Sequence, residues 1–320
     1  MSPATPEAYL LLEDAGRSFP LTAGQTWAVG RGEGCVVMLD SRAVSRLHAL
    51  IQRRDDGEYA LVDLGSRNGC FVNGQRVSLP RVLKDRDRLA FGDQELLFRA
   101  RPRPVTNPPE PDSSTRNMPT AVLHAPSLAT IMVVDIRDFT RLTNSVGEDV
   151  LAQTVGTWFL RVGQIVRRQG SWAQKYIGDA VMAVWLHPNE GSMISDVRRA
   201  LESVNEIQGM TSVLHHHLPL PGPLRIGAGI NTGPVVVDGG ESTAIGEAVN
   251  AAFRLESVTK ELGMGVVLGE RTYAELRPTY PSPFVSREVA LKGYENEREV
   301  WAISFEGLQV FLAGSVGWAG

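Results

Sequence analysis

The hydrophobic pattern divides the chain into two parts that are built differently. Between residues 25 and 99, short apolar runs are separated by Gly, Asn and Asp turns, and no helical period persists across them. Runs of this length between such turns are typical of β-strands. They predict strands at Trp27–Val29, Cys35–Leu39, His48–Ile51, Tyr59–Val62, Cys70–Val72 and Glu95–Phe98. We therefore expect the first part to be an all-β domain.

From residue 130 onwards, strand-like and helix-like segments alternate. The pattern predicts strands at 130–135, 172–176, 180–185 and 224–231, and helices at 147–168, 193–214 and 246–259. The second and third of these strands are close enough in the chain to form a hairpin. The alternation predicts an α/β domain in which helices pack on a sheet.

A segment rich in proline joins the two parts. Residues 101–120 read RPRPVTNPPEPDSSTRNMPT, and this composition is typical of an extended linker without a core. We therefore expect a β-rich domain, a linker, an α/β domain and a short tail, at 1–100, 101–124, 125–305 and 306–320. The tail suggests no function.

Two aspartates lie in settings that otherwise resemble buried strands. Asp135 directly follows the apolar run 131–134, and Asp179 precedes the apolar run 180–185. A carboxylate in such a place is costly to bury unless a cation or hydrogen bonds satisfy it. One alone could equally be a capped turn or half of an ion pair. Two brought together would hold hard divalent cations through oxygen ligands, which is the minimum apparatus for two-metal phosphoryl chemistry.

The segments around both aspartates resemble the class III nucleotidyl cyclases, the family of the mammalian adenylate and guanylate cyclases. VVDIRDFTRLT resembles the family's first metal-binding segment, and KYIGDAVMAVW resembles the hairpin with its second metal ligand. IGAGINTGPVVV with TAIGEAVNAAFRLE resembles the purine and transition-state region, and LKGYENEREVWAI resembles the closing strand. The four segments occur in family order across residues 128–304. The resemblance implies an α/β fold with a mostly antiparallel sheet.

The resemblance implies a metal site. Asp135 and Asp179 take the two metal-ligand positions, and the backbone carbonyl of Ile136 takes the place of a further contact. Two Mg²⁺ or Mn²⁺ ions are implied for each active site. Such ions activate the ribose 3′-oxygen and neutralise the leaving pyrophosphate.

The resemblance also implies catalytic and phosphate-binding residues. Asn250 takes the position that orients the ribose, Arg254 the position that stabilises the transferring phosphate, and Lys292 the position that holds the terminal phosphates. Residues four apart lie on one face of a helix, so Asn250 and Arg254 could both reach one ligand. A guanidinium and an ammonium suit the spread charge of phosphate.

Two positions govern the choice of purine. Lys175 lies four residues before Asp179, and Thr243 lies seven before Asn250. Adenylate cyclases of the family pair a Lys with an Asp or a Thr, whereas guanylate cyclases usually carry Glu in place of the Lys. A Thr hydroxyl can accept a hydrogen bond from the adenine amino group. The pair therefore implies ATP as substrate, and some members with this Thr respond to bicarbonate.

The first part resembles the forkhead-associated (FHA) domain, a β-sandwich that binds phosphothreonine peptides. The segments VGRGEGCVVMLD, VSRLHALI and LVDLGSRNGCFVNGQRV carry the resemblance, which spans Trp27 to Phe98. The implied phosphopeptide-binding residues are Arg31, Ser45, Arg46, Arg67 and Asn68. An Arg and a hydroxyl form charge-assisted hydrogen bonds with a phosphate dianion, while His48 takes a bracing position. The ligand would be a partner protein or the chain's own linker. A sandwich that has lost its ligand stays an alternative.

The cyclase resemblance implies a homodimer, because one chain of the family supplies the aspartates and its partner supplies the purine, ribose and phosphate contacts. A two-fold dimer then has two equivalent sites. The stretch VVVDGGES, residues 235–242, is shorter than the family's usual hairpin, which leaves the strength of the dimer open. Asp138 replaces a usual Gly, and Glu247 stands where Asp is common.

The bulk composition excludes some functions. The 320 residues carry 32 basic and 36 acidic side chains, a net charge of −4, so nothing indicates a nucleic-acid surface. Two cysteines, Cys35 and Cys70, fit a reducing compartment. The first residues do not form a signal peptide, and no run of about 18 apolar residues could span a membrane. We expect a cytoplasmic protein. His215–His217 are expected at a frayed helix end rather than in a metal site.

The leading hypothesis is an adenylate cyclase that converts ATP to 3′,5′-cyclic AMP and pyrophosphate at a homodimer interface, regulated through phosphopeptide binding. One alternative is a guanylate cyclase, against which Lys175 argues. Another is a phosphopeptide-binding protein with an inactive cyclase-like half. Against that second alternative, the residues such halves usually lose are all present, namely Asp135, Asp179, Asn250 and Arg254.

Overall fold

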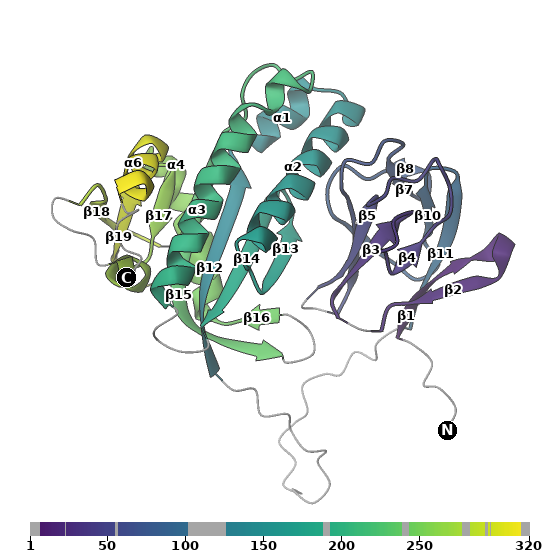
Figure 1. Ribbon diagram of the computed structural model, residues 1–320, viewed down its shortest axis with the longest axis horizontal. Helices are drawn as coiled ribbons and strands as arrows, with labels where there is room; N and C mark the ends of the chain where they lie inside the picture. The colour runs from purple at the N-terminus through teal and green to yellow at the C-terminus, as the bar shows by residue number, and fades with distance from the viewer. Residues whose placement is uncertain are drawn as a thin grey trace, which may run out of the picture.

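The computed structural model describes residues 7–22, 24–54, 57–101, 126–187, 193–238, 243–276, 282–291, 294 and 296–314. It contains a β-rich body formed by the first part of the chain and a larger body in which helices cover a sheet (Figure 1). The proline-rich linker, except for Arg101, lies outside the described residues, as does Lys292.

The β-rich body consists of two sheets around one core, so the all-β prediction is confirmed. One sheet has the order β2-β1-β11-β10-β7-β8, and the other has the order β4-β3-β5-β6-β9. The strands are β1 (Ala8–Leu12), β2 (Arg17–Pro20), β3 (Thr26–Gly30), β4 (Val37–Met38), β5 (Ala49–Arg53), β6 (Tyr59–Asp63), β7 (Cys70–Val72), β8 (Gln75–Arg76), β9 (Arg81–Leu83), β10 (Arg88–Phe91) and β11 (Gln94–Ala100). A short 3-10 turn, Glu13–Ala15, joins β1 to β2.

The predicted strand Cys35–Leu39 is wrong at its start. The backbone N–H of Cys35 donates to the carbonyl of Gly32 at 3.0 Å and closes a turn, so only Val37–Met38 pair with β3. Strands β1 and β2 were not predicted, and β1 pairs with both β2 and β11. Cys70 is buried in the core shared by the two sheets.

The larger body has a mixed sheet of order β13-β14-β12-β15-β17-β19-β18, with β16 paired to β15. Among its described strands the only parallel pair is β15 with β17, so the prediction of a mostly antiparallel sheet is confirmed. The strands are β12 (Pro126–Ile136), β13 (Ala173–Ile177), β14 (Ala180–His187), β15 (Ile226–Asp238), β16 (Thr243–Ile245), β17 (Val266–Leu268), β18 (Val285–Val289) and β19 (Arg298–Ile303). The helices are α1 (Phe139–Ser145), α2 (Glu148–Arg168), α3 (Met193–Ser212), α4 (Glu247–Glu261), α5 (Glu270–Leu276) and α6 (Phe305–Gly314).

The central strand β12 is buried on both faces, which explains its continuous apolar run. Met132 and Val134 belong to the apolar cluster that includes Trp158 of α2 and residues of α3. The alternate residues Ile131 and Val133 belong to a second cluster with side chains of α4. Helices α2 and α3 therefore cover one face of the sheet (Figure 1), and α4 covers the other.

The last described helix belongs to the α/β body. Leu308 of α6 is fully buried in the same cluster as α2 and α3, so a domain limit at residue 305 would separate a packed helix from its core. Helix α3 ends at Ser212 and is followed by a 3-10 turn, Leu214–His216. The histidine run therefore lies at a helix end, as the pattern predicted.

Candidate active site

The strand ends of the sheet bring Asp135 and Asp179 together. Asp135 lies near the end of β12 and is in register with Ala180 of β14. Asp179 lies in the turn between β13 and β14, where Gly178 has a φ of 61°, a left-handed conformation that Gly adopts readily. Burial, the charge of Asp179 and then the charge of Glu256 raise the pKa of Asp135 to about 7. The two carboxylates are close enough to repel each other.

The donor chemistry of this pair fits hard divalent cations, which prefer carboxylate and carbonyl oxygens. A cation between the two carboxylates would relieve their repulsion. One oxygen of Asp135 accepts a hydrogen bond from the backbone N–H of Ile136 at 2.8 Å. No group of three or more His, Cys, Asp or Glu suited to a metal occurs in the described part of the chain.

Sequence reasoning missed Glu256, which adds a third negative charge near the pair. Its pKa is raised by burial and by the charge of Asp179, while Arg137 opposes the shift. Gly227 of β15 leaves room for it, because a Cβ atom there would lie 2.9 Å from Glu256 Oε1. At Gly229 a Cβ would lie 2.3 Å from the backbone oxygen of Ala252. The IGAGI segment therefore lets α4 lie directly on β15.

Helix α4 carries a second group of candidate residues, centred on the carboxylate of Glu247. Arg254 Nη1 donates to Glu247 Oε1 at 2.8 Å, and the hydroxyl of Tyr294 donates to the same oxygen at 2.6 Å. The Arg254 guanidinium also lies 4.6 Å from the centre of the Tyr294 ring. The hydrogen bond from Tyr294 holds the pKa of Glu247 below its usual value, and Arg254 and Asn250 act in the same direction.

Sequence reasoning did not find Tyr294, and it treated Glu247 only as a departure from the family pattern. One signal was available for Glu247, because residues seven apart lie on one face of a helix, and this is the spacing of Glu247 and Arg254. No local pattern pointed to Tyr294, which reaches α4 from beyond β18. One chain therefore holds the paired aspartates in one group and Asn250 with Arg254 in another.

The two purine-reading candidates lie on strands. Lys175 is in β13, and its side chain is buried, with 4% exposed. Thr243 begins β16, where it pairs with Asp238, and its side chain is outside the described residues, as is all of Lys292. The structure therefore places Lys175 and leaves the side chains of Thr243 and Lys292 undescribed.

The structure gives a reason for the usual Gly at position 138. Asp138 precedes α1 with a φ of 56°, in the left-handed region that favours Gly but admits Asp. Its carboxylate is bound by Arg225 at 2.7 Å and by Lys260 at 3.0 Å. The replacement is thus compatible with the local backbone.

Three loops of the β-rich body gather the phosphopeptide candidates. The backbone N–H of Arg31 donates to the carbonyl of Ser45 at 3.0 Å, and that of Arg67 donates to Ser45 Oγ at 3.3 Å. Asn68 Nδ2 donates to the carbonyl of Ala43 at 2.7 Å. The side chains of Arg31, Arg46, Arg67 and Asn68 are exposed. They form one polar surface with Ser45.

The buried side chain of His48 links two of these loops through hydrogen bonds. The backbone N–H of Ser45 donates to His48 Nδ1 at 3.0 Å, so that Nε2 carries the proton and donates to the carbonyl of Gly69 at 3.2 Å. The His48 side chain is fully buried. It therefore positions the loops without reaching the surface.

Comparison with known proteins accounts for both bodies. Residues 124–304 match the family model of the adenylate and guanylate cyclase catalytic domain, which is more than half of the chain. The chain belongs to this cyclase family. Residues 27–92 match the model of the FHA domain. The chain therefore has an FHA domain in front of a class III cyclase catalytic domain.

Individual relatives match only parts of the chain. An adenylate cyclase of Anabaena cylindrica is 25% identical over 185 residues, which are 54% of this chain and 36% of that protein. The transcriptional regulatory protein EmbR of Mycobacterium tuberculosis is 39% identical over 92 residues, 28% of this chain and 23% of that protein. The chain thus spans about a third or less of these relatives. The crystal structure of the adenylyl cyclase CyaB from P. aeruginosa is similar with a TM-score of 0.48 and 24% identity, covering 56% of this chain and 94% of that one.

The cyclase and FHA domains contain no described helix that is both long and apolar enough to cross a membrane. In the cyclase domain, the described residues from the predicted site fall into the aspartate pair, the Glu247-centred group and Lys175 on β13.

Proposed function

We propose that this cyclase is an adenylate cyclase, which converts ATP to 3′,5′-cyclic AMP and pyrophosphate at a homodimer interface. The observation that carries the proposal is the pairing of Asp135 and Asp179 at the strand ends, where burial and then the charge of Asp179 raise the pKa of Asp135. A pair of such carboxylates is what two-metal phosphoryl chemistry requires. Two Mg²⁺ or Mn²⁺ ions held there would activate the ribose 3′-oxygen and neutralise the leaving pyrophosphate.

The other residues would act on the nucleotide. Cyclisation forms a bond between the ribose 3′-oxygen and the α-phosphorus and breaks the bond to pyrophosphate, while the 3′-hydroxyl loses its proton. Asn250 would orient the ribose, and Arg254 would stabilise the charge on the transferring phosphate. Lys292 would hold the terminal phosphates.

Lys175 and Thr243 favour ATP over GTP in this proposal. The ammonium of Lys175 can only donate hydrogen bonds, so it suits the acceptor nitrogens of adenine, and the Thr243 hydroxyl can accept from the amino group. Because one chain holds the aspartate pair in one group and Asn250 with Arg254 in another, we assign the purine, ribose and phosphate contacts to one chain and the metal ligands to its partner. A two-fold dimer then contains two equivalent sites.

The test is to incubate the purified full chain with ATP or GTP in the presence of Mg²⁺ or Mn²⁺ and to identify the product by chromatography. Asp135→Asn and Asp179→Asn should each reduce the rate by about a thousandfold, which corresponds to about 4 kcal/mol of lost metal stabilisation. Asp14→Asn is the matched control, because Asp14 is exposed on the FHA domain. Wild-type turnover by the double variant Asp135→Asn/Asp179→Asn would refute the metal site, and a preference for GTP would make the protein a guanylate cyclase.

We further propose that the FHA domain binds a phosphothreonine segment and thereby regulates the cyclase. The polar surface of Arg31, Ser45, Arg46, Arg67 and Asn68 supports this, because exposed guanidinium groups around a hydroxyl suit a phosphate dianion. The segment would come from a partner protein or from the linker. Linker candidates are Thr106, Thr115 and Thr120.

A further inference from the structure

The FHA domain and the cyclase domain share one apolar cluster. Leu50, Val62 and Leu64 of the FHA domain belong to the same cluster of buried side chains as Val155 and Trp158 of α2. The three FHA side chains are at most 6% exposed. The outer face of the β5–β6 sheet therefore lies against the cyclase domain rather than in water.

The sequence of these strands agrees with a covered outer face. In β5, Ala49 and Ile51 point into the core of the sandwich, whereas Leu50 points outward, and in β6 Leu61 points inward and Val62 outward. A sandwich strand with a solvated outer face alternates apolar and polar residues, whereas one covered on both faces is apolar throughout. The runs HALI and YALV are apolar on both faces.

Two glycines bring the backbones of the domains into direct contact. A Cβ atom built on Gly156, in the middle of α2, would lie 2.0 Å from the backbone nitrogen of Gly65 and 3.0 Å from the carbonyl oxygen of Asp63. Glycine inside a helix costs roughly 1 kcal/mol relative to alanine. The close contact with the FHA loop explains why a glycine stands at position 156 of this helix.

Polar contacts extend the contact between the domains to strand β13 and to the first turn of α2. Gln52, which is 3% exposed, accepts a hydrogen bond through Oε1 from the backbone N–H of Tyr176 at 3.2 Å. Tyr176 belongs to β13, the edge strand of the cyclase sheet, so the FHA domain caps a strand edge that would otherwise be open. In the first turn of α2, Asp149 pairs with Arg76 of the FHA domain at 3.0 Å.

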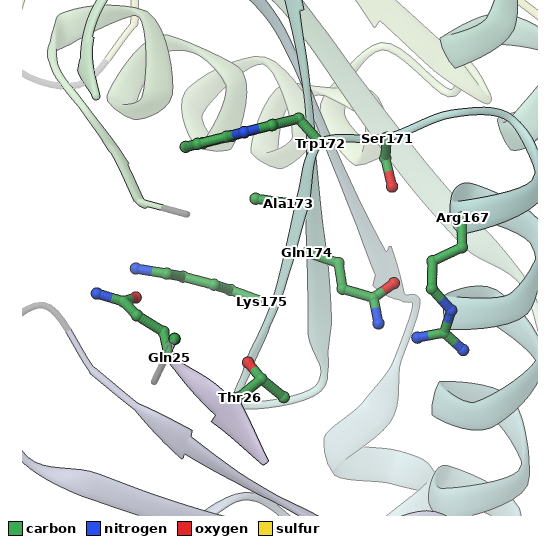
Figure 2. Close-up of a pocket in the computed structure, with 9 residues that line it drawn as sticks. Gln25, Thr26, Arg167, Ser171, Trp172, Ala173, Gln174 and Lys175 are labelled. Carbon is green, nitrogen blue, oxygen red and sulfur yellow. The ribbon is translucent and has the colours of Figure 1, made fainter. Parts of the chain in front are cut away.

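The contact of the FHA domain with α2 and β13 also covers Lys175. A pocket of about 350 Å³ between the domains is lined by Gln25 and Thr26 of the FHA domain and by Arg167, Trp172 and Lys175 of the cyclase domain. The Lys175 ammonium and the Gln25 amide end on the same side of this pocket (Figure 2). With 4% of its surface exposed, Lys175 is out of reach of a nucleotide held by another chain.

We propose that the FHA domain, seated on α2 and β13, occupies the surface on which a second copy of the chain must dock, so that FHA seating and productive dimer formation exclude each other. The inference rests on the proposed function, in which Lys175 reads a purine bound by the partner's aspartates. That contact requires the surface around Lys175 to face the second copy. The chain as folded is then a closed form of the enzyme, and release of the FHA domain opens it.

The test uses Gly156→Ala in the full chain. Alanine favours the helix, but its methyl group collides with the Gly65 backbone, and overpacking of this kind costs roughly 1–3 kcal/mol. Gly209→Ala in α3 is the matched control, because nothing lies within 4 Å of a Cβ atom built there. Asp149→Arg is a second variant that should fold, since Asp149 is 85% exposed and its reversal repels Arg76.

Three measurements decide the proposal. The first is the rate at which Lys175 is acetylated by a soluble reagent, read by mass spectrometry, together with amide hydrogen exchange at Tyr176. The second is the dimer fraction from sedimentation velocity, and the third is cyclase activity at low protein concentration. In Gly156→Ala we expect Lys175 labelling to rise roughly tenfold or more, with a larger dimer fraction and higher activity. Asp149→Arg should act in the same direction, and Gly209→Ala should match wild type.

The outcomes separate this proposal from the proposed function. If wild-type Lys175 is labelled as fast as in Gly156→Ala, the FHA domain does not cover it and the proposal fails. If labelling rises but the dimer fraction does not, the two states do not exclude each other, and the proposal also fails. If labelling and dimer fraction both rise while no cyclic nucleotide forms from ATP or GTP, the exclusion stands and the proposed function is wrong.

Discussion

The guanidinium of Arg254 lies 4.6 Å from the centre of the Tyr294 ring, and both side chains bind the same oxygen of Glu247. The arginine that we propose to meet the transferring phosphate is thus held between an aromatic face and a carboxylate. Arginine side chains have many rotamers, and fixing them beforehand lowers the entropy cost of binding a ligand. We therefore expect Tyr294 to position Arg254 in the proposed reaction.

Two replacements of Tyr294 should slow the cyclase to different extents. Tyr294→Phe removes the hydrogen bond to Glu247 but keeps the ring, whereas Tyr294→Ala removes both. A cation–π contact of this kind contributes about 1 kcal/mol, so we expect Tyr294→Ala to be about fivefold slower in kcat than Tyr294→Phe. In an Arg254→Ala background the same replacements should have no further effect on kcat, and an undiminished effect there would show that Tyr294 does not act through Arg254.

Two inactive variants should restore activity when they are mixed. In the proposed site Asp135→Ala would remove a metal ligand and Asn250→Ala a ribose contact, so each homodimer should be inactive. A mixed dimer has one site with both defects and one site with neither. Random pairing makes about half of the dimers mixed, so activity should recover to roughly a quarter of wild type. Subunit exchange is verified with differently tagged chains, and an inactive mixture after verified exchange contradicts the shared site.

The purine preference should depend on the charge at position 175. Lys175→Glu replaces a donor by an acceptor, so we expect kcat/KM for ATP to fall while the metal concentration at half-maximal activity stays unchanged. The matched control is Lys84→Glu, a charge reversal on the FHA domain, where Lys84 is exposed. If the ratio of ATP to GTP turnover is the same in Lys175→Glu and wild type, Lys175 does not read the purine.

The phosphopeptide surface should depend on Arg31. Its replacement by Ala removes charge-assisted hydrogen bonds that contribute about 1.5–3 kcal/mol each, so we expect affinity for a phosphothreonine peptide to fall by at least about tenfold. Isothermal titration calorimetry on the full chain measures the change. Arg42→Ala is the matched control, because Arg42 is exposed on a neighbouring loop. Equal binding of the phosphorylated and unphosphorylated peptides would contradict phosphothreonine recognition.

The FHA domain should lose stability in mild acid through His48. Burial lowers the pKa of His48, although the hydrogen bond to the Gly69 carbonyl and the charge of Asp63 act in the opposite direction. The unfolded chain, with a His pKa of about 6.5, therefore binds the proton more readily than the folded chain. The contribution of neutral His48 to the stability of the FHA domain is fully present above about pH 6.5. It decreases as the pH falls toward the lowered pKa of the folded state.

Hydrogen exchange of peptides from β5 to β7, measured from pH 8 to pH 5 and corrected for intrinsic exchange, follows the stability of the FHA domain alone. This readout is needed because burial also lowers the pKa of His187 in the cyclase domain. His48→Gln removes the titrating group, so it should lower stability at every pH but flatten its dependence on pH. An unchanged pH dependence in this variant would mean that His48 is not the cause.

Much of the architecture was predictable from short-range patterns. The alternation of apolar runs with Gly, Asn and Asp turns predicted the β-rich domain. The alternation of strand-like and helix-like segments predicted a helix at 147–168, within one residue of the observed α2, Glu148–Arg168. Asp135 stood out as a carboxylate directly behind an apolar run, because burying a charge is costly wherever it occurs. These features depend on residues close together in the chain.

Tertiary structure decided the contacts between distant segments. Tyr294 meets Arg254 from another element, Glu256 joins the aspartate pair because two glycines of β15 admit α4, and Gly156 receives the FHA loop. A local pattern can indicate that a face is apolar, as in β5 and β6, but it does not say which surface covers it. The sequence determined which residues must be buried or satisfied, and only the folded chain decided their partners, because packing joins surfaces that are far apart in the sequence.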